Sequence, residues 1–417
     1  MTDDVVPPED RAILRDLAMQ YMEVCESDRN KERIALWRDH NSLRRTRAPV
    51  YCSHDFAALL HMEIRPHLPD PRTRTLRGHE MWFHRQLWSA TIPDDHVYYP
   101  WVTVRAPMRQ PEIGIWGFES DRIHDEVSRG WRDLPVIHTT DDLDVLRATP
   151  HEVIDAHPPE AKRLEDILGD IMPVHVRRST VYGIWGGTDL SEAAGTAFGL
   201  EELLYALYDK PDVVHRLMAF MRDAVIANLR QGEAVGDWST AESQNYGVPA
   251  YCHELPDPGP NTHGAKLSDL CFFTHAQEFE TVSPEQHEQF LLDYQMPIME
   301  LFGLVNYGCC ESLHNKIEML RAIPNLRKIL MGPNADFRKC IDEIGGDYIA
   351  SWRPSPATMV TGGFDPDSVR RQIREALAYA KDTNIEVMLK EMMTLDGDIS
   401  RLFKWAEIGM EESERAA

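Results

Sequence analysis

The chain has 417 residues, of which 68 are Asp or Glu and 44 are Lys or Arg, so its formal net charge at pH 7 is −24. A field of that sign repels polyanions, which argues against a nucleic-acid partner and against electrostatic attachment to anionic membranes. Hydrophobic residues make up 43% and charged residues 27%, a mixture typical of folded globular proteins. This length suits one large barrel with extensions or two domains of ordinary size.

Nothing in the sequence points to secretion or to a membrane. The first ten residues, MTDDVVPPED, contain neither the basic nor the apolar segment of a secretory signal, and no stretch reaches the ~18–20 apolar residues of a membrane span. Seven cysteines scattered over the chain are too few for a disulfide framework. We therefore expect a cytoplasmic protein whose thiols are buried or bind a metal.

Residues 1–95 form the first predicted unit. Leu14, Leu17 and Tyr21 recur at helical spacing and predict an amphipathic helix. The other elements expected here are helices at 31–40 and 78–89 and a short strand at 49–52. Because this stretch has few apolar residues for a core of its own, we expect a helical extension packed on the main domain.

Residues 96–417 alternate short apolar strands with long amphipathic helices, which predicts an α/β fold with a parallel sheet. About eight such units suit a closed TIM-type (β/α)8 barrel, whereas periodicity alone also allows an open doubly wound sheet. Strands are expected at 97–104, 174–179, 241–246, 270–274, 304–308, 326–331, 348–351 and 385–389, and helices at 200–207, 213–229, 284–302, 315–322, 336–344, 366–381 and 400–411.

The densest set of metal-ligand types follows the expected strand at 304–308. Cys309, Cys310, Glu311 and His314 lie within six residues at the carboxyl end of that strand, the catalytic end of a (β/α)8 barrel. Thiolate and imidazole ligands suit zinc, and an open coordination position would serve catalysis. Cys310 and His314 would share a helix face if the next helix begins early. Alternatively, one or both cysteines are simply small buried residues.

Other strand ends supply further candidates. His275 and Glu278 follow the strand at 270–274, and Glu391 follows the last strand. We expect His275 to be a ligand, a proton donor or a structural histidine, and the two glutamates to be ligands, general bases or solvated acids. Arg353, Arg177 and Arg178 also lie at strand ends, where they could bind a substrate carboxylate, form ion pairs or face solvent.

Three segments, taken in order, resemble the uroporphyrinogen-decarboxylase superfamily. They are residues 199–212 before a long helix, residues 283–285 before a helix that ends near 302, and residues 307–314 leading into 320–324. The resemblance covers roughly residues 150–412. It implies a (β/α)8 barrel, an enzyme that is often a homodimer, and one of two activities. These are decarboxylation, or zinc-dependent methyl transfer between corrinoid proteins and thiols.

The sequence departs from both branches. Decarboxylases carry an arginine-rich motif where this chain has residues 47–56, and the missing arginines disfavour a polycarboxylate substrate. The methyltransferases use a His-x-Cys motif where this chain has Tyr307 and Cys309, and a late cysteine that the last strand lacks. We expect a zinc-dependent methyltransferase of an atypical subgroup, acting on a small molecule with a corrinoid or corrinoid protein. The alternatives are a metal-independent decarboxylase anchored by the three arginines, or a non-catalytic corrinoid-binding barrel.

Overall fold

Six parallel strands form a curled sheet at the centre of the molecule. The computed structural model describes residues 6–53, 59–124, 130–182, 189–243, 248–390 and 392–417. In spatial order the strands of this sheet are β1 (Val50–Cys52), β10 (Asn384–Leu389), β9 (Ile349–Trp352), β8 (Leu326–Met331), β7 (Leu304–Tyr307) and β6 (Cys271–Thr274). Nearly every residue in them is buried, as expected for a sheet covered on both faces.

Two further parallel strands, β2 (Val102–Arg105) and β5 (Val174–Arg177), pair only with each other. The predicted closed eight-stranded barrel is therefore not formed by continuous hydrogen bonding in the described residues. The strand expected at 241–246 is also not seen, because Thr240–Glu242 is a 3-10 turn and residues 244–247 lie outside the described part.

Side chains occupy the strand edges where the barrel would close. Beside β1, Asp95 accepts a hydrogen bond from Val50 N (2.8 Å) and Asp94 accepts one from Cys52 N (2.9 Å). Beside β5, the Asn261 amide accepts from Val176 N (2.9 Å) and donates to Val174 O (2.8 Å). These side chains therefore satisfy backbone atoms that a neighbouring strand would otherwise use.

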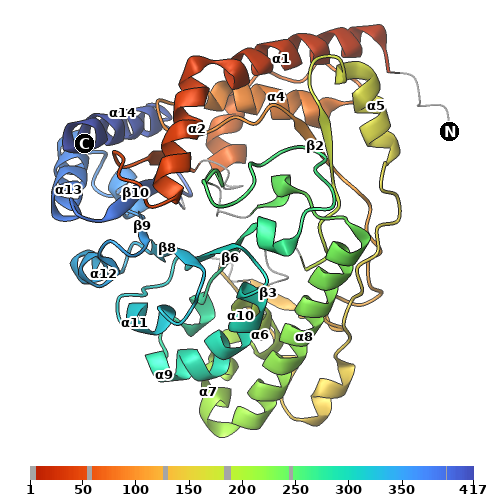
Figure 1. Cartoon of the computed structure of the whole chain (residues 1–417), viewed down its shortest axis with the longest axis vertical. Helices are drawn as coiled ribbons and strands as arrows, with labels where there is room; N and C mark the ends of the chain where they lie inside the picture. Colours follow the sequence, from red (N-terminus) through yellow and green to blue (C-terminus); the bar gives the residue numbers. More distant parts are fainter. Residues whose placement is uncertain (1–5, 54–58, 125–129, 183–188, 244–247, 391) are drawn as a thin grey trace.

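Helices form an outer shell around the strands (Figure 1). They are α1 (Pro8–Glu26), α2 (Asp28–Asn41), α4 (Arg77–Ser89), α5 (Pro159–Leu168), α6 (Leu190–Phe198), α7 (Leu200–Asp209), α8 (Pro211–Val235), α9 (Pro284–His287), α10 (Asp293–Met299), α11 (Ile317–Leu320), α12 (Phe337–Ile344), α13 (Pro366–Tyr379) and α14 (Ser400–Ala416). The expected helix at 284–302 is divided, because the π turn Glu288–Leu292 separates α9 from α10. Among the described residues, no helix has the length and hydropathy needed to cross a bilayer.

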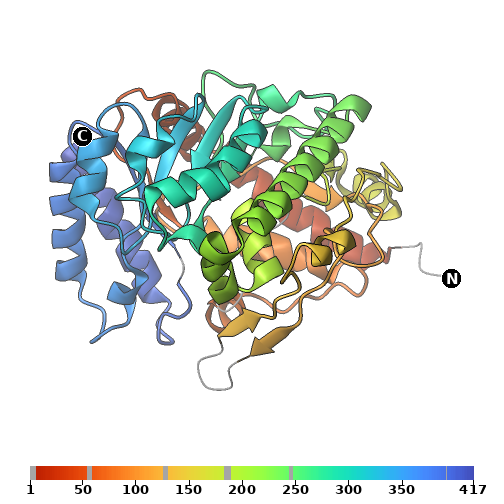
Figure 2. The same ribbon diagram turned by 90° about the horizontal axis from the view of Figure 1, so that it is seen from below.

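The N-terminal segment joins the main sheet directly, because β1 pairs in parallel with β10. The domain boundary at residue 95 stays a prediction. An antiparallel hairpin of β3 (Arg122–His124) and β4 (Trp131–Asp133) projects from the lower side of the molecule in Figure 2. Trp37 of α2, Tyr51, Phe273, Leu330 and Met388 pack together between the strands.

Candidate functional site

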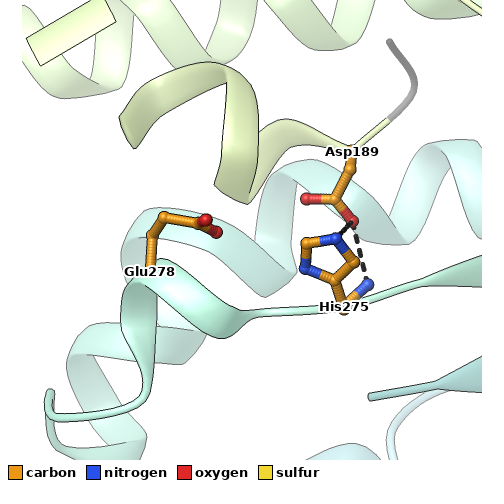
Figure 3. Close-up of side chains that lie close together, drawn as sticks. All are labelled: Asp189, His275 and Glu278. Atoms are coloured by element: carbon orange, nitrogen blue, oxygen red, sulfur yellow. Dashed lines mark hydrogen bonds and ion pairs between the residues drawn. The ribbon is translucent and has the colours of Figure 1, made fainter. Parts of the chain in front are cut away.

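Asp189, His275 and Glu278 come together at the carboxyl end of β6. Their ligand atoms all lie within 4.8 Å of one another, and this is the single group of its kind found among the described residues. His275 directly follows β6, Glu278 lies in the 3-10 turn Gln277–Phe279, and Asp189 precedes α6. Figure 3 shows the side chain of Glu278 pointing toward the other two.

Asp189 accepts hydrogen bonds from the start of helix α6 and from the end of strand β6. Its Oδ1 caps helix α6 by accepting from Ser191 N (2.9 Å) and Glu192 N (3.1 Å). Its Oδ2 accepts from His275 N (2.9 Å) and lies 3.5 Å from His275 Nε2. An N-cap residue with a strand-end partner fixes both the start of α6 and the position of the histidine.

Glu278 is held against α6. Ser191 Oγ donates to Glu278 Oε2 (2.5 Å) and accepts from Glu278 N (3.2 Å). A Cβ atom at Gly195 would lie 2.7 Å from Glu278 Cγ, so only a glycine at that helical position leaves room for the glutamate. The local sequence of α6 therefore places this carboxylate beside the histidine.

The electrostatics of the group favour a bound cation. Burial opposes protonation of His275, but Asp189, Glu311, Cys309 and Glu278 outweigh it and raise its pKa to about 9. Burial also raises the pKa of Glu278. Two carboxylates share one imidazole, which must carry a proton at neutral pH unless another cation takes that place.

A chain of buried hydrogen bonds supports the group from behind. Tyr307 Oη donates to Gln295 Oε1 (2.7 Å) and lies 2.8 Å from His287 Nε2. Gln295 Nε2 then donates to His275 O (2.8 Å) and to Thr274 Oγ1 (3.0 Å). Thr274 Oγ1 in turn donates to Asp189 Oδ2 (3.1 Å). Burial lowers the pKa of His287 to about 3, with Lys316 adding to the effect, so this histidine is neutral and donates through Nε2.

The predicted cysteine pair lies at the end of β7, next to the same group. Gly308 has φ of 104°, which turns the chain out of the strand, and Cys309 is buried. The two sulfur atoms of Cys309 and Cys310 lie 3.4 Å apart, a contact rather than a disulfide bond, and Lys390 Nζ lies 3.9 Å from Cys309 Sγ.

Glu311 and His314 are placed differently from Cys309. The Glu311 carboxylate accepts from Ala276 N and Cys309 N, both at 2.8 Å, so it clamps the loops after β6 and β7 together. His314 lies in a turn, because α11 begins only at Ile317, and the shared helix face expected for Cys310 and His314 is not formed. Glu391 lies outside the described residues.

The three arginines separate into two kinds. Arg353 is 2% exposed, donates to Cys309 O and lines a pocket of about 320 Å³ between β8, β9, α12 and α13. Arg177 Nε lies 3.1 Å from Glu242 Oε2, and Arg178 lies 3.6 Å from Asp237. Arg353 therefore belongs to the neighbourhood of Cys309, whereas the other two have acidic partners of their own.

Sequence reasoning missed Asp189 and Lys390. Asp189 begins the pattern Asp-Leu-Ser-Glu that is typical of a helix start, so its capping role had a signal. Its contact with a histidine 86 positions later had none. Lys390 follows the last strand beside Glu391, and only the fold brings it to Cys309.

The chain matches no family model and no curated protein. Among solved structures it is similar to a methyltransferase from Methanosarcina mazei, at 11% identity and a TM-score of 0.48. That likeness covers 92% of this chain and 97% of the other. These values are too low to assign an activity, and the superfamily resemblance of the sequence stays a prediction.

Proposed function

We propose that this chain is a zinc-dependent methyltransferase that moves a methyl group between a corrinoid and a thiol. The observation that carries the proposal is the group formed by buried Asp189 and His275 with half-buried Glu278 at the carboxyl end of β6. One imidazole nitrogen and two carboxylate oxygens are ligands that catalytic zinc accepts while keeping a position open for substrate. The corrinoid rests on the sequence resemblance.

The residues fit a divalent cation by charge as well as by ligand type. The acids around His275 hold a proton on it up to a pKa of about 9, so they favour a positive charge at that place. A metal would take the place of this proton, since only a neutral imidazole binds a metal. When bound, zinc would act as a Lewis acid that lowers the pKa of a thiol.

The neighbouring residues have definite tasks in this proposal. Glu278, with its raised pKa, is a better proton acceptor than an ordinary glutamate and would receive the thiol proton when it is not a ligand. Lys390 and Cys309 form a polar wall beside the group. The sequence suggests a second ligand set, made of Cys309, Cys310, Glu311 and His314, and the experiment below separates the two sets.

A metal-independent decarboxylase is less well supported. That alternative uses Arg353, Arg177 and Arg178 to bind a substrate carboxylate, but Arg353 lines the pocket between β8 and β9 whereas Arg177 lines a separate pocket at the ends of β2 and β5. Arg178 lies 3.6 Å from Asp237. Arg353 donates to the backbone of Cys309, which positions the thiol loop. A non-catalytic corrinoid-binding barrel would have no need of the buried Asp189, His275 and Glu278 group.

The test is the zinc content of anaerobically purified protein. We expect about one equivalent in the wild type, and less than about a fifth of that in a His275→Gln, Glu278→Gln double variant, because this variant removes two of the three proposed protein ligands. Methyl transfer from methylcobalamin to 2-mercaptoethanol should fall at least about 100-fold in that variant. His253→Gln is the matched control, because His253 is exposed on the surface and pairs with Asp39.

Two results would contradict the proposal. Wild-type protein that contains no zinc, and that decarboxylates a carboxylate substrate in the presence of a chelator, would favour the decarboxylase alternative. Zinc that is kept in the His275 and Glu278 variant but lost from a Cys309→Ser, Cys310→Ser variant would move the metal to the cysteine pair.

A further inference from the structure

A second pocket, of about 650 Å³, lies at the carboxyl ends of β2 and β5. Its wall includes Arg105, Arg177, Thr180 and the first residues of α5, together with the apolar Met108 and Val181. A pocket of this size is suited to a small organic molecule rather than to a single ion. None of its residues belongs to the proposed metal group, so its function is independent of the proposal above.

Two guanidinium groups stand next to each other on this wall. Arg105 and Arg177 are register partners in the parallel β2–β5 pair, so their side chains leave the same face of neighbouring strands. Like charges at such positions repel each other. Glu242 and Ser179 engage only Nε of Arg177, and Arg105 has no hydrogen bond or ion pair in the described part of the chain. Both Nη atoms of Arg177 and the whole guanidinium of Arg105 therefore remain open to a negative group.

A buried hydroxyl on the same wall also lacks a partner. Thr180 is 6% exposed, and its Oγ1 makes no hydrogen bond among the described residues. A buried polar atom without a partner costs free energy, so it indicates a ligand that completes its hydrogen bond. This observation is independent of the arginines, because a threonine hydroxyl carries no charge.

The amino terminus of α5 adds a third group of donors. Pro158 and Pro159 begin this helix, and no side chain caps it. Free N–H groups at such a terminus attract anions. The one acid on the wall, Glu160, lies 2.7 Å from His79 Nε2 and is engaged there. The chain as a whole has a net charge of −24, whereas this wall carries mainly positive charges and hydrogen-bond donors.

We infer that this pocket binds a small organic oxyanion, whose carboxylate or phosphate head contacts Arg105, Arg177 and Thr180 while its body lies against Met108 and Val181. Arginine forks suit both head groups, which share the geometry of paired oxygen acceptors.

The experiment is isothermal titration calorimetry of the full chain with two probes, succinate and inorganic phosphate. We expect one of them to bind with a Kd of about 1 mM or tighter, a modest affinity for a head group without its natural body. Binding of succinate alone identifies a carboxylate ligand, and binding of phosphate alone identifies a phosphate ester. Affinity should fall as salt is added, because the contacts are charged.

Variants assign the binding to this pocket. Arg105→Gln should weaken it about tenfold and Thr180→Val about threefold, as expected for a charged and a neutral hydrogen bond. Arg109→Gln is the matched control, because Arg109 lies on the same segment but pairs with exposed Glu152. Arg105 is exposed, so its variant should fold, and Thr180→Val keeps the side-chain shape. Failure of both probes to bind, or equal affinity in Arg105→Gln and Arg109→Gln, would overturn the inference.

Discussion

Two buried polar groups lie inside the sheet, one at each end of its strands, and they are built differently. Near the amino ends, Lys328 of β8 lies 2.5 Å from Glu386 of β10, and His40 of α2 lies 3.3 Å from the same carboxylate. All three side chains are almost fully buried. Burial opposes ionisation of Glu386, but Lys328 and His40 outweigh it and lower its pKa to about 2.

The group at the carboxyl ends is not balanced in this way. Asp189 and Glu278 share the imidazole of His275, and the surrounding acids outweigh burial and raise its pKa to about 9. At the amino ends one ammonium already meets one carboxylate, and burial lowers the pKa of His40 so that it stays neutral. Burial alone therefore does not indicate function. The two groups differ in charge balance and in position. The group around His275 has an excess of negative charge, and it lies at the carboxyl ends of the strands, where α/β barrels have their active sites.

The largest effect is expected at the balanced group. Lys328→Met removes the one ammonium beside Glu386 and leaves a buried carboxylate without its partner, which should lower the free energy of unfolding by about 3–5 kcal/mol. Urea denaturation measures this loss. Lys328→Met combined with Glu386→Leu is the control, because it removes both charges and should recover most of the stability. Equal losses in the single and double variants would show that packing around Lys328, rather than charge balance, maintains this group.

A smaller loss of stability is expected when the hydrogen-bond chain that leads from Tyr307 to His275 and Asp189 is broken. Tyr307→Phe leaves His287 Nε2 and Gln295 Oε1 without partners and should cost about 1–3 kcal/mol of unfolding free energy. It should also weaken zinc binding about tenfold or more, because Gln295 orients His275 and Thr274.

Tyr182→Phe is the control for that variant. Tyr182 is equally buried, and its hydroxyl bonds with Ile115 O and Thr149 N, which belong to a different part of the core. Its variant should lose similar stability and keep the zinc affinity of the wild type. If both tyrosine variants bind zinc equally well, Tyr307 has a structural role only.

The sequence predicts the individual strands and helices better than it predicts whether the sheet closes into a barrel. Near-continuous apolar runs such as Leu326–Met331 are visible as strands because both of their faces are covered. The interruption beside β5 depends on Asn261, a loop residue 85 positions from Val176, and no local pattern reveals it. Periodicity measures how a segment is buried, whereas closure depends on which segment lies beside it.

The candidate site shows the same division. His275 and Glu278 were found because ligand-type residues after a strand fall at a known end of the sheet. Asp189 was not found, because its role depends on the contact between α6 and the end of β6. The ion pair of Lys328 was not predicted either. Its partner, Glu386, lies on another strand, and the local sequence around Lys328 does not identify it.

The smallest effect is a pH dependence that belongs to His287. The pKa of His287 is about 3 in the folded protein, below the ~6.5 of an unfolded chain. Its contribution to stability is therefore complete only above pH ~6.5 and is lost as the pH falls toward 3. Between pH ~6.5 and ~5.5 this one group should lower the unfolding free energy by about 1 kcal/mol. His287→Gln should remove that part of the slope, whereas Tyr307→Phe, which breaks the same hydrogen bond but keeps the imidazole, should retain it. Identical slopes in the wild type and His287→Gln would mean that the pKa of His287 is the same in the folded and unfolded protein, and that burial does not hold this histidine neutral.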